Sequence, residues 1–116
     1  MNNPSLKQEL TSLLKDRFSL SQSTRANYAR GEDTYDPILS QAVVFPETNE
    51  EVSRILKLCN DHKVPVVPFG TGTSLEGNVV GNDKGITISL EKMDKILSVN
   101  AADFDCRVQA LSLIHI

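Results

Sequence analysis

A glycine-rich segment in the second half of the chain contains the residue types that hold an anion. It reads PFGTGTSLEGN over residues 68–78 and directly follows a short apolar run. Glycine lets backbone N–H groups turn inward and approach a ligand closely, and successive inward N–H groups form a nest that suits phosphate oxygens. Thr71, Thr73 and Ser74 add hydroxyl donors, and Glu76 is the only charged residue. The segment therefore predicts a phosphate-binding loop.

Two familiar phosphate-binding motifs do not match this loop. A Walker A motif requires a lysine after its second glycine, but Asn78 and Val79 follow Gly77. A Rossmann fingerprint requires a third glycine where Leu75 stands, at the start of a helix. Residues 70–85 show no helical period, so loop amides alone would hold the anion. A purely structural turn between two strands is the alternative.

The segments before the loop predict the elements that position it. Residues 42–45 (AVVF) and 64–69 (VPVVPF) are apolar runs that predict strands. Between them, Thr48 and Glu51 form a T-x-x-E capping box. The helix that follows has apolar residues at i, i+3, i+4 and i+7: Val52, Ile55, Leu56 and Cys59. Together these segments predict a βαβ unit with parallel strands.

Further elements are predicted on both sides of this unit. Residues 86–90 alternate apolar and polar and predict a half-buried strand. Residues 96–99 and 104–110 predict two strands joined by a hairpin loop, with an apolar face left exposed. Residues 4–18 predict an amphipathic helix with a capping box at Ser5 and Gln8, and residues 23–30 predict a short helix. The predicted class is α+β, with an N-terminal helical segment (1–40) before the domain at 41–110.

Composition excludes several classes of function. The chain has 116 residues, a net charge of −3 and no basic run, which argues against a nucleic-acid surface. No apolar stretch approaches the about 20 residues that span a bilayer, and the start lacks the features of a secretory signal. We expect a cytoplasmic setting. Cys59 and Cys106 are predicted to be reduced core residues, His62 to interact with a helix C-terminus, and no metal site is expected.

The last six residues, LSLIHI at 111–116, interrupt the preceding strand pattern. They can be encoded by a DNA string that resembles the transposon mosaic end used to prepare sequencing libraries. We expect these residues to be foreign and the chain to be the truncated front of a longer protein. A native apolar strand end is the alternative. In either case we assign His115 no chemical role.

Three segments occur in the order found in one protein family. They are VVFPETNEE (43–51), VPVVPFGTGTSLEGN (64–78) and GITISLEKMDKILSV (85–99). Through them the chain resembles the N-terminal part of FAD-linked oxidases of the p-cresol methylhydroxylase (PCMH)/vanillyl-alcohol oxidase superfamily. Within it, PFGTGTSLEG is typical of D-lactate dehydrogenases (cytochrome) and glycolate oxidase FAD-linked subunits. The resemblance, over about residues 20–110, implies a truncated PCMH-type FAD-binding domain.

The resemblance implies a role for the loop in binding FAD. The residues that match the family's diphosphate-binding loop are Gly70, Thr71, Gly72, Thr73, Ser74 and Gly77, with Pro68, Phe69, Leu75 and Asn78 lining it. The loop contains no His, Cys or Tyr, so we expect FAD to be bound non-covalently. The family's catalytic histidines lie beyond residue 110, so no catalytic residue is assigned and the fragment alone is expected to be inactive.

For the whole protein the resemblance implies oxidation of a D-2-hydroxy acid, D-lactate or glycolate, to the 2-oxo acid. Its partners would be this small-molecule substrate and an electron acceptor that the sequence does not identify. The implied location is the cytoplasm, or the periphery of the inner membrane. The alternatives are another FAD-linked oxidase or reductase of the superfamily, or a non-redox α/β nucleotide-binding module.

Overall fold

The computed structural model describes residues 3–112. Its elements, in chain order, are α1 (Pro4–Leu14), β1 (Phe18–Ser19), α2 (Gln22–Asn27), β2 (Val43–Val44), α3 (Asn49–Asp61), β3 (Val66–Phe69), β4 (Ile86–Ser89), β5 (Ile96–Asn100), a 3-10 turn (Ala101–Asp103) and β6 (Asp105–Val108). The mixture confirms the predicted α+β class. None of the helices within these residues has the length and apolar character needed to cross a membrane.

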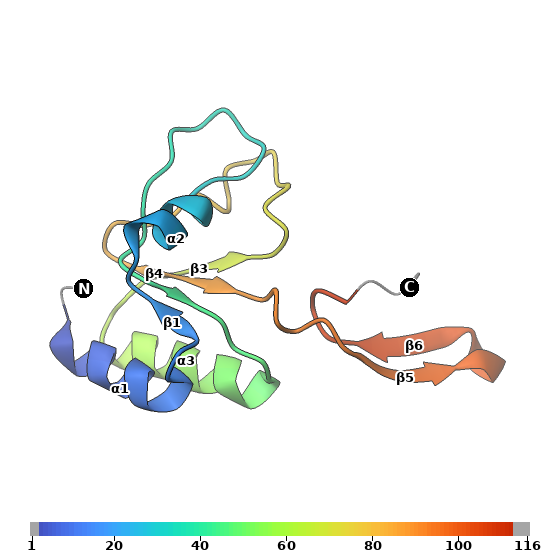
Figure 1. Ribbon diagram of the computed structural model, residues 1–116. Coiled ribbons are helices and arrows are strands. Elements are labelled where there is room, and N and C mark those ends of the chain that lie inside the picture. The colour runs from blue at the N-terminus through green and yellow to red at the C-terminus, as the bar shows by residue number, and fades with distance from the viewer. Residues whose placement is uncertain (1–2, 113–116) are drawn as a thin grey trace.

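Four strands form one sheet in the order β1-β2-β4-β3. Both β2 and β3 pair with β4 in parallel, which confirms the predicted parallel direction of the βαβ strands. The two strands are not neighbours, however, because β4 lies between them. In Figure 1, α1 and α3 cover one face of the sheet, and α2 and the glycine-rich loop lie on the other.

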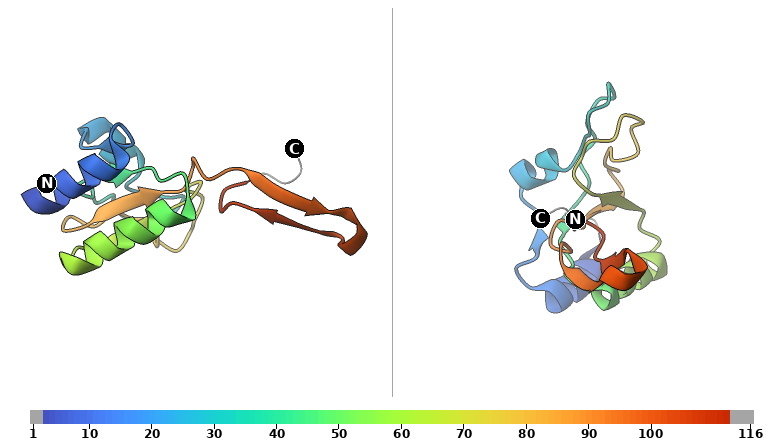
Figure 2. Two further views of the ribbon diagram at one scale, coloured as in Figure 1. Left: turned by 90° about the horizontal axis from the view of Figure 1, so that it is seen from below. Right: turned by 90° about the vertical axis from the view of Figure 1, so that its right-hand side faces the viewer.

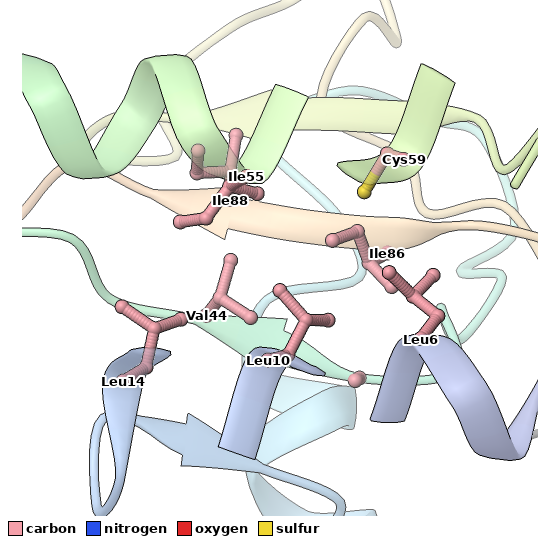
Figure 3. Packing of buried hydrophobic residues seen from close by; sticks show 9 residues of the cluster. Leu6, Leu10, Leu14, Val44, Ile55, Cys59, Ile86 and Ile88 are labelled. Carbon is pink, nitrogen blue, oxygen red and sulfur yellow. The ribbon is translucent and has the colours of Figure 1, made fainter. Parts of the chain in front are cut away.

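The main core lies between the sheet and the two helices α1 and α3. Helical residues pack against alternate residues of β2 and β4 (Figure 3), because side chains in a strand point to opposite faces in turn. The buried members of this cluster are Leu6, Leu10, Leu14, Ala42, Val44, Ile55, Cys59, Ile86 and Ile88. The N-terminal helix therefore shares one core with the βαβ unit.

The predicted half-buried character of the strand at 86–90 is wrong, because β4 is buried on both faces. Thr87 and Ser89 point away from the helices and are nonetheless fully buried. The hydroxyl of Thr87 is hydrogen-bonded to that of the buried Ser40 (2.7 Å), and the hydroxyl oxygen of Ser89 accepts the N–H of Glu91 (3.4 Å), so each of these buried polar groups has a partner. The alternating pattern therefore separates an apolar face from a hydroxyl face, both covered by other parts of the chain.

The N-terminal helix is shorter than predicted and is capped by a different residue. The side-chain oxygen of Asn3 accepts the N–H of the residue three positions on, at 3.0 Å. Pro4 occupies the first turn, where its missing N–H is tolerated. The predicted capping box at Ser5 and Gln8 is therefore wrong, and Phe18 lies in β1. At α3 the predicted N-cap is confirmed, because Thr48 accepts the N–H of Glu51. The reciprocal half of the capping box differs, because the Glu51 carboxylate accepts the N–H of Glu47.

The hairpin formed by β5 and β6 projects from the body of the molecule (Figures 1 and 2). Phe104 is 97% exposed, as expected for the apolar face of residues 104–110, and Val99 on the neighbouring strand is 70% exposed. Cys106 is also exposed, so its predicted core position is wrong, whereas Cys59 is buried as predicted. The reason is that no other element within residues 3–112 covers the hairpin. Of the six residues expected to be foreign, 113–116 lie outside the described residues.

An ion pair joins the N-terminal segment to the start of α3. Arg17 donates two hydrogen bonds to the carboxylate of Glu51, at 2.7 and 2.5 Å. That carboxylate also accepts the backbone N–H of Glu47 at 2.8 Å. The hydrogen bond from Arg17 is the main cause that lowers the pKa of Glu51 from 4.5 to about 2. Both side chains are less than one-fifth exposed, so the pair is shielded from solvent.

We expect Glu51→Gln to lower the free energy of unfolding at neutral pH by about 1–3 kcal/mol, the usual range for a hydrogen-bonded charge. Because folding lowers the pKa of Glu51, its contribution is present above pH 4.5 and is lost as pH falls toward 2. Urea unfolding at several pH values should show the two proteins converging in acid. Glu50→Gln, in the same helical turn, is the control for the helix dipole. A pH-independent difference would contradict the ion-pair explanation.

Candidate functional site

The glycine-rich loop begins where two parallel strands end side by side. Phe69, the last residue of β3, is paired with Ser89, the last residue of β4. The carboxyl edge of parallel strands is the usual place for ligands in open α/β sheets. A hollow of about 490 Å³ lies there, lined by Asn27, Tyr28, Arg30, Gly31, Glu32, Phe69, Gly70, Thr71, Gly72, Glu91 and Leu111.

Only part of the predicted site faces this hollow. Phe69, Gly70, Thr71 and Gly72 line it. The remaining predicted residues lie along the loop outside its lining: Pro68, Thr73, Ser74, Leu75, Gly77 and Asn78. Leu75 is 70% exposed, so it does not serve as an apolar wall here. The structure thus separates an inner part of the loop from an outer part.

Two glycines set the path of the loop, and both have a φ of +76°. A Cβ at Gly72 would lie 2.7 Å from the ring of Phe69, and one at Gly77 would lie 2.6 Å from the ring of Tyr35. Positive φ is strained for residues with a side chain. Gly70 differs, because among residues 3–112 a Cβ there would meet only Leu111, at 3.5 Å.

The backbone of the loop has unused hydrogen-bond donors. Within residues 3–112, the amides of residues 71–75 have no acceptor. Neighbouring polar groups are bonded locally: the hydroxyls of Thr71 and Thr73 lie 3.3 Å apart, and Ser74 donates to Asn78. Five successive N–H groups without an internal acceptor, with hydroxyls beside them, are groups that can donate to phosphate oxygens. The loop therefore fits a phosphate group of a cofactor.

An aromatic cluster packs around Phe69, at the start of the loop. The ring of Tyr28 stands edge-on to Phe69 and Phe45, with centroids 5.0 and 5.5 Å away. Its hydroxyl donates to Glu91 at 2.8 Å. Burial, and then the bond to Glu91, raise the pKa of Tyr28 to about 12. The phenol therefore stays neutral and fixes Phe69, whose ring lies against Gly72.

Sequence reasoning missed Tyr28, Arg30 and Glu91 as lining residues. Glu91 follows β4 closely, so the pairing of β4 with β3 could have placed it beside Gly70. No local pattern marked Tyr28 or Arg30, because only the chain path after α2 brings them to the sheet edge. Among the described residues, no group of His, Cys, Asp and Glu side chains is arranged to hold a metal ion.

Residues 40–111 match the model of a family described as the FAD binding domain. Because this match covers more than half of the chain, the chain belongs to the FAD binding domain family. The family's cofactor, FAD, contains a diphosphate, and the free amides at residues 71–75 fit such a group. Curated relatives and solved structures add detail about the class of enzyme in which this domain occurs.

Several relatives are named as oxidoreductases of small hydroxy acids. The chain is 37% identical over 91 residues to "Probable D-lactate dehydrogenase, mitochondrial" of Danio rerio, covering 78% of this chain and 18% of the relative. It is 48% identical over 71 residues to "D-lactate dehydrogenase [cytochrome] 1, mitochondrial" of Saccharomyces cerevisiae, covering 59% and 12%. It is 31% identical over 94 residues to "Glycolate oxidase subunit GlcD" of Bacillus subtilis, covering 81% of this chain and 20% of the relative. The chain thus spans at most a fifth of these relatives.

Solved structures confirm the fold. An alkyldihydroxyacetonephosphate synthase superposes with a TM-score of 0.86 at 22% identity, covering 94% of this chain and 24% of that protein. A p-cresol methylhydroxylase with substrate bound superposes with a TM-score of 0.68 at 23% identity, covering 83% and 20%. The predicted PCMH-type FAD-binding fold is therefore confirmed.

We expect Gly72→Ala to lower the free energy of unfolding by about 1–3 kcal/mol, because alanine at a φ of +76° is strained and its Cβ would meet Phe69. Gly70→Ala is the matched control and should change stability by less than about 0.5 kcal/mol. Urea unfolding of both variants checks this. Equal losses in the two variants would contradict the assigned role of Gly72.

Proposed function

We propose that the loop at residues 68–78 binds the diphosphate of a non-covalently held FAD. The observation that carries the proposal is the run of amides at residues 71–75 with no acceptor within the described chain. Residues 71–75 are exposed or half-buried, so they are accessible to an incoming ligand. Membership of the FAD binding domain family supports FAD over other phosphate ligands.

The predicted residues would have different roles in this site. Gly70, Thr71 and Gly72 would present backbone and hydroxyl donors toward the hollow, with Phe69 as the floor. Thr73 and Ser74 would donate from the outer part of the loop, and Gly77 would allow the return turn. Pro68, Leu75 and Asn78 would shape the loop. A bound flavin would supply the electron acceptor that amino-acid side chains lack.

We further propose that the domain serves an enzyme that oxidises a D-2-hydroxy acid, D-lactate or glycolate, to the 2-oxo acid. Relatives named D-lactate dehydrogenase and glycolate oxidase subunit support this class. A relative from Stutzerimonas stutzeri, 31% identical over 104 residues, is named D-2-hydroxyglutarate dehydrogenase, so the shared substrate group is the 2-hydroxy acid. The residues described here would anchor the cofactor and take no part in proton transfer.

The cellular compartment stays a prediction. The sequence favours the cytoplasm, whereas the names of the fish and yeast relatives specify mitochondria. We propose a cytoplasmic location, which fractionation of the source cells can test.

The decisive test of FAD binding introduces a carboxylate into the hollow. Gly70→Asp should fold, because a Cβ there meets only Leu111 at an ordinary distance. Its negative charge would lie beside the negatively charged diphosphate and should weaken FAD binding about tenfold or more, since two like charges placed side by side cost several kcal/mol. The measurement is the FAD dissociation constant of the apoprotein, made on the complete polypeptide that the gene encodes.

Two controls separate charge from bulk and from net charge. Gly70→Asn has nearly the same shape without the charge and should weaken binding less. Gln8→Glu adds the same charge on the exposed side of α1, on the opposite face of the sheet, and should have no effect. Unchanged FAD binding in Gly70→Asp would reject the proposed diphosphate site.

The substrate class is tested by mixing the complete, flavin-loaded gene product anaerobically with D-lactate, glycolate or D-2-hydroxyglutarate. We expect at least one of these acids to bleach the yellow flavin absorbance. We also expect L-lactate to reduce the flavin more slowly than D-lactate does. If none of the D-acids or glycolate reduces the flavin, the proposed substrate class is wrong, while FAD binding would stand on its own measurement.

A further inference from the structure

The hollow beside the loop has an unfavourable charge balance for a diphosphate. Glu32 and Glu91 line it, and Glu76 lies on the loop itself. The free amides at residues 71–75 are neutral. Among the residues that line this hollow, Arg30 is the single cation. It makes no hydrogen bond or ion pair with any residue from 3 to 112, so its charge is available to a ligand.

The backbone around Arg30 is held against the loop. The N–H of Glu32 donates to the carbonyl of Ser74 at 3.0 Å, and the N–H of Gly81 donates to the carbonyl of Ala29 at 3.2 Å. Gly31 permits this close approach, because a Cβ there would lie 2.7 Å from the same Ser74 carbonyl. Arg30 therefore stands on a segment that is bonded on both sides to the glycine-rich loop and its continuation.

A second anchor lies just before Arg30 in the chain. Tyr28 is fixed by its hydrogen bond to Glu91 and by its edge-on contact with Phe69. Phe69 in turn lies against Gly72. The segment 28–32 therefore contacts the start of the loop through Tyr28 and reaches Ser74 through the N–H of Glu32. A rigid backbone of this kind reduces the entropy that a binding side chain loses when it contacts its ligand.

We propose that Arg30 binds the FAD diphosphate, and that residues 28–32 form the second wall of the cofactor site. This rests on the proposed function of the loop, and it extends the site to a segment outside the family match at residues 40–111. The guanidinium suits the task, because its planar set of donors matches phosphate oxygens with two hydrogen bonds. Its charge would offset the nearby carboxylates of Glu32 and Glu91.

The test compares Arg30→Gln and Arg30→Lys in the complete gene product, with FAD and ADP as probes and adenosine as a probe without phosphate. We expect Arg30→Gln to weaken FAD and ADP binding by the same factor, about tenfold, and to leave adenosine unaffected. Arg30→Lys should recover part of the loss. The dependence of FAD affinity on salt should be shallower in Arg30→Gln, because one charge pair is missing.

The control is Arg54→Ala, which removes an exposed cation from α3 on the opposite face of the sheet. It should bind FAD as the unaltered protein does. If Arg30→Gln binds FAD and ADP normally, the assignment of Arg30 fails while the loop proposal stands. An equal loss in Arg30→Gln and Arg30→Lys, with an unchanged salt dependence, also rejects it. If the unaltered protein binds neither FAD nor ADP, both proposals fail.

Discussion

The pairing of β4 between β2 and β3 is the constraint on which the rest of the structure depends. It places the central strand where both faces are covered, so Ile86 and Ile88 pack on the helices while Thr87 and Ser89 face the loop side. It also brings the end of β3 beside the end of β4. The glycine-rich loop and Glu91 meet at this edge, and the hollow forms between them.

The N-terminal segment is part of the same physical unit as the matched domain. Leucines of α1 complete the core, the pair of Arg17 and Glu51 joins this segment to α3, and residues 28–32 lie along the loop. Burial of apolar side chains accounts for the first connection, and a hydrogen-bonded ion pair between side chains accounts for the second. The third connection has a different consequence, because it supplies Tyr28 and Arg30 to the hollow, whose other lining residues include no cation.

Much of the fold could be predicted from local patterns. The helix α3, its capping by Thr48 and the apolar runs of β2 and β3 depend on neighbouring residues, and the structure confirms them. Of the apolar face predicted for α3, Ile55 and Cys59 are buried and Val52 is partly buried, whereas Leu56 is 46% exposed. Errors arose where distant contacts decide. Burial of Cys106 needs a partner layer that residues 3–112 do not provide, and burial of Thr87 needs Ser40, 47 positions away in sequence. The N-terminal helix was misjudged because Asn3 and Pro4 together form a better start than Ser5.

The sequence by itself determined which hydrogen-bond donors the loop contains, because glycines and hydroxyl residues follow directly after a strand. It also determined the family, through the segment at residues 64–78. Only the tertiary structure decided which loop residues face the hollow and which other side chains line it. The reason is that β4, Tyr28 and Arg30 are brought to the end of β3 by chain crossings and long-range hydrogen bonds, which have no periodic trace in the sequence.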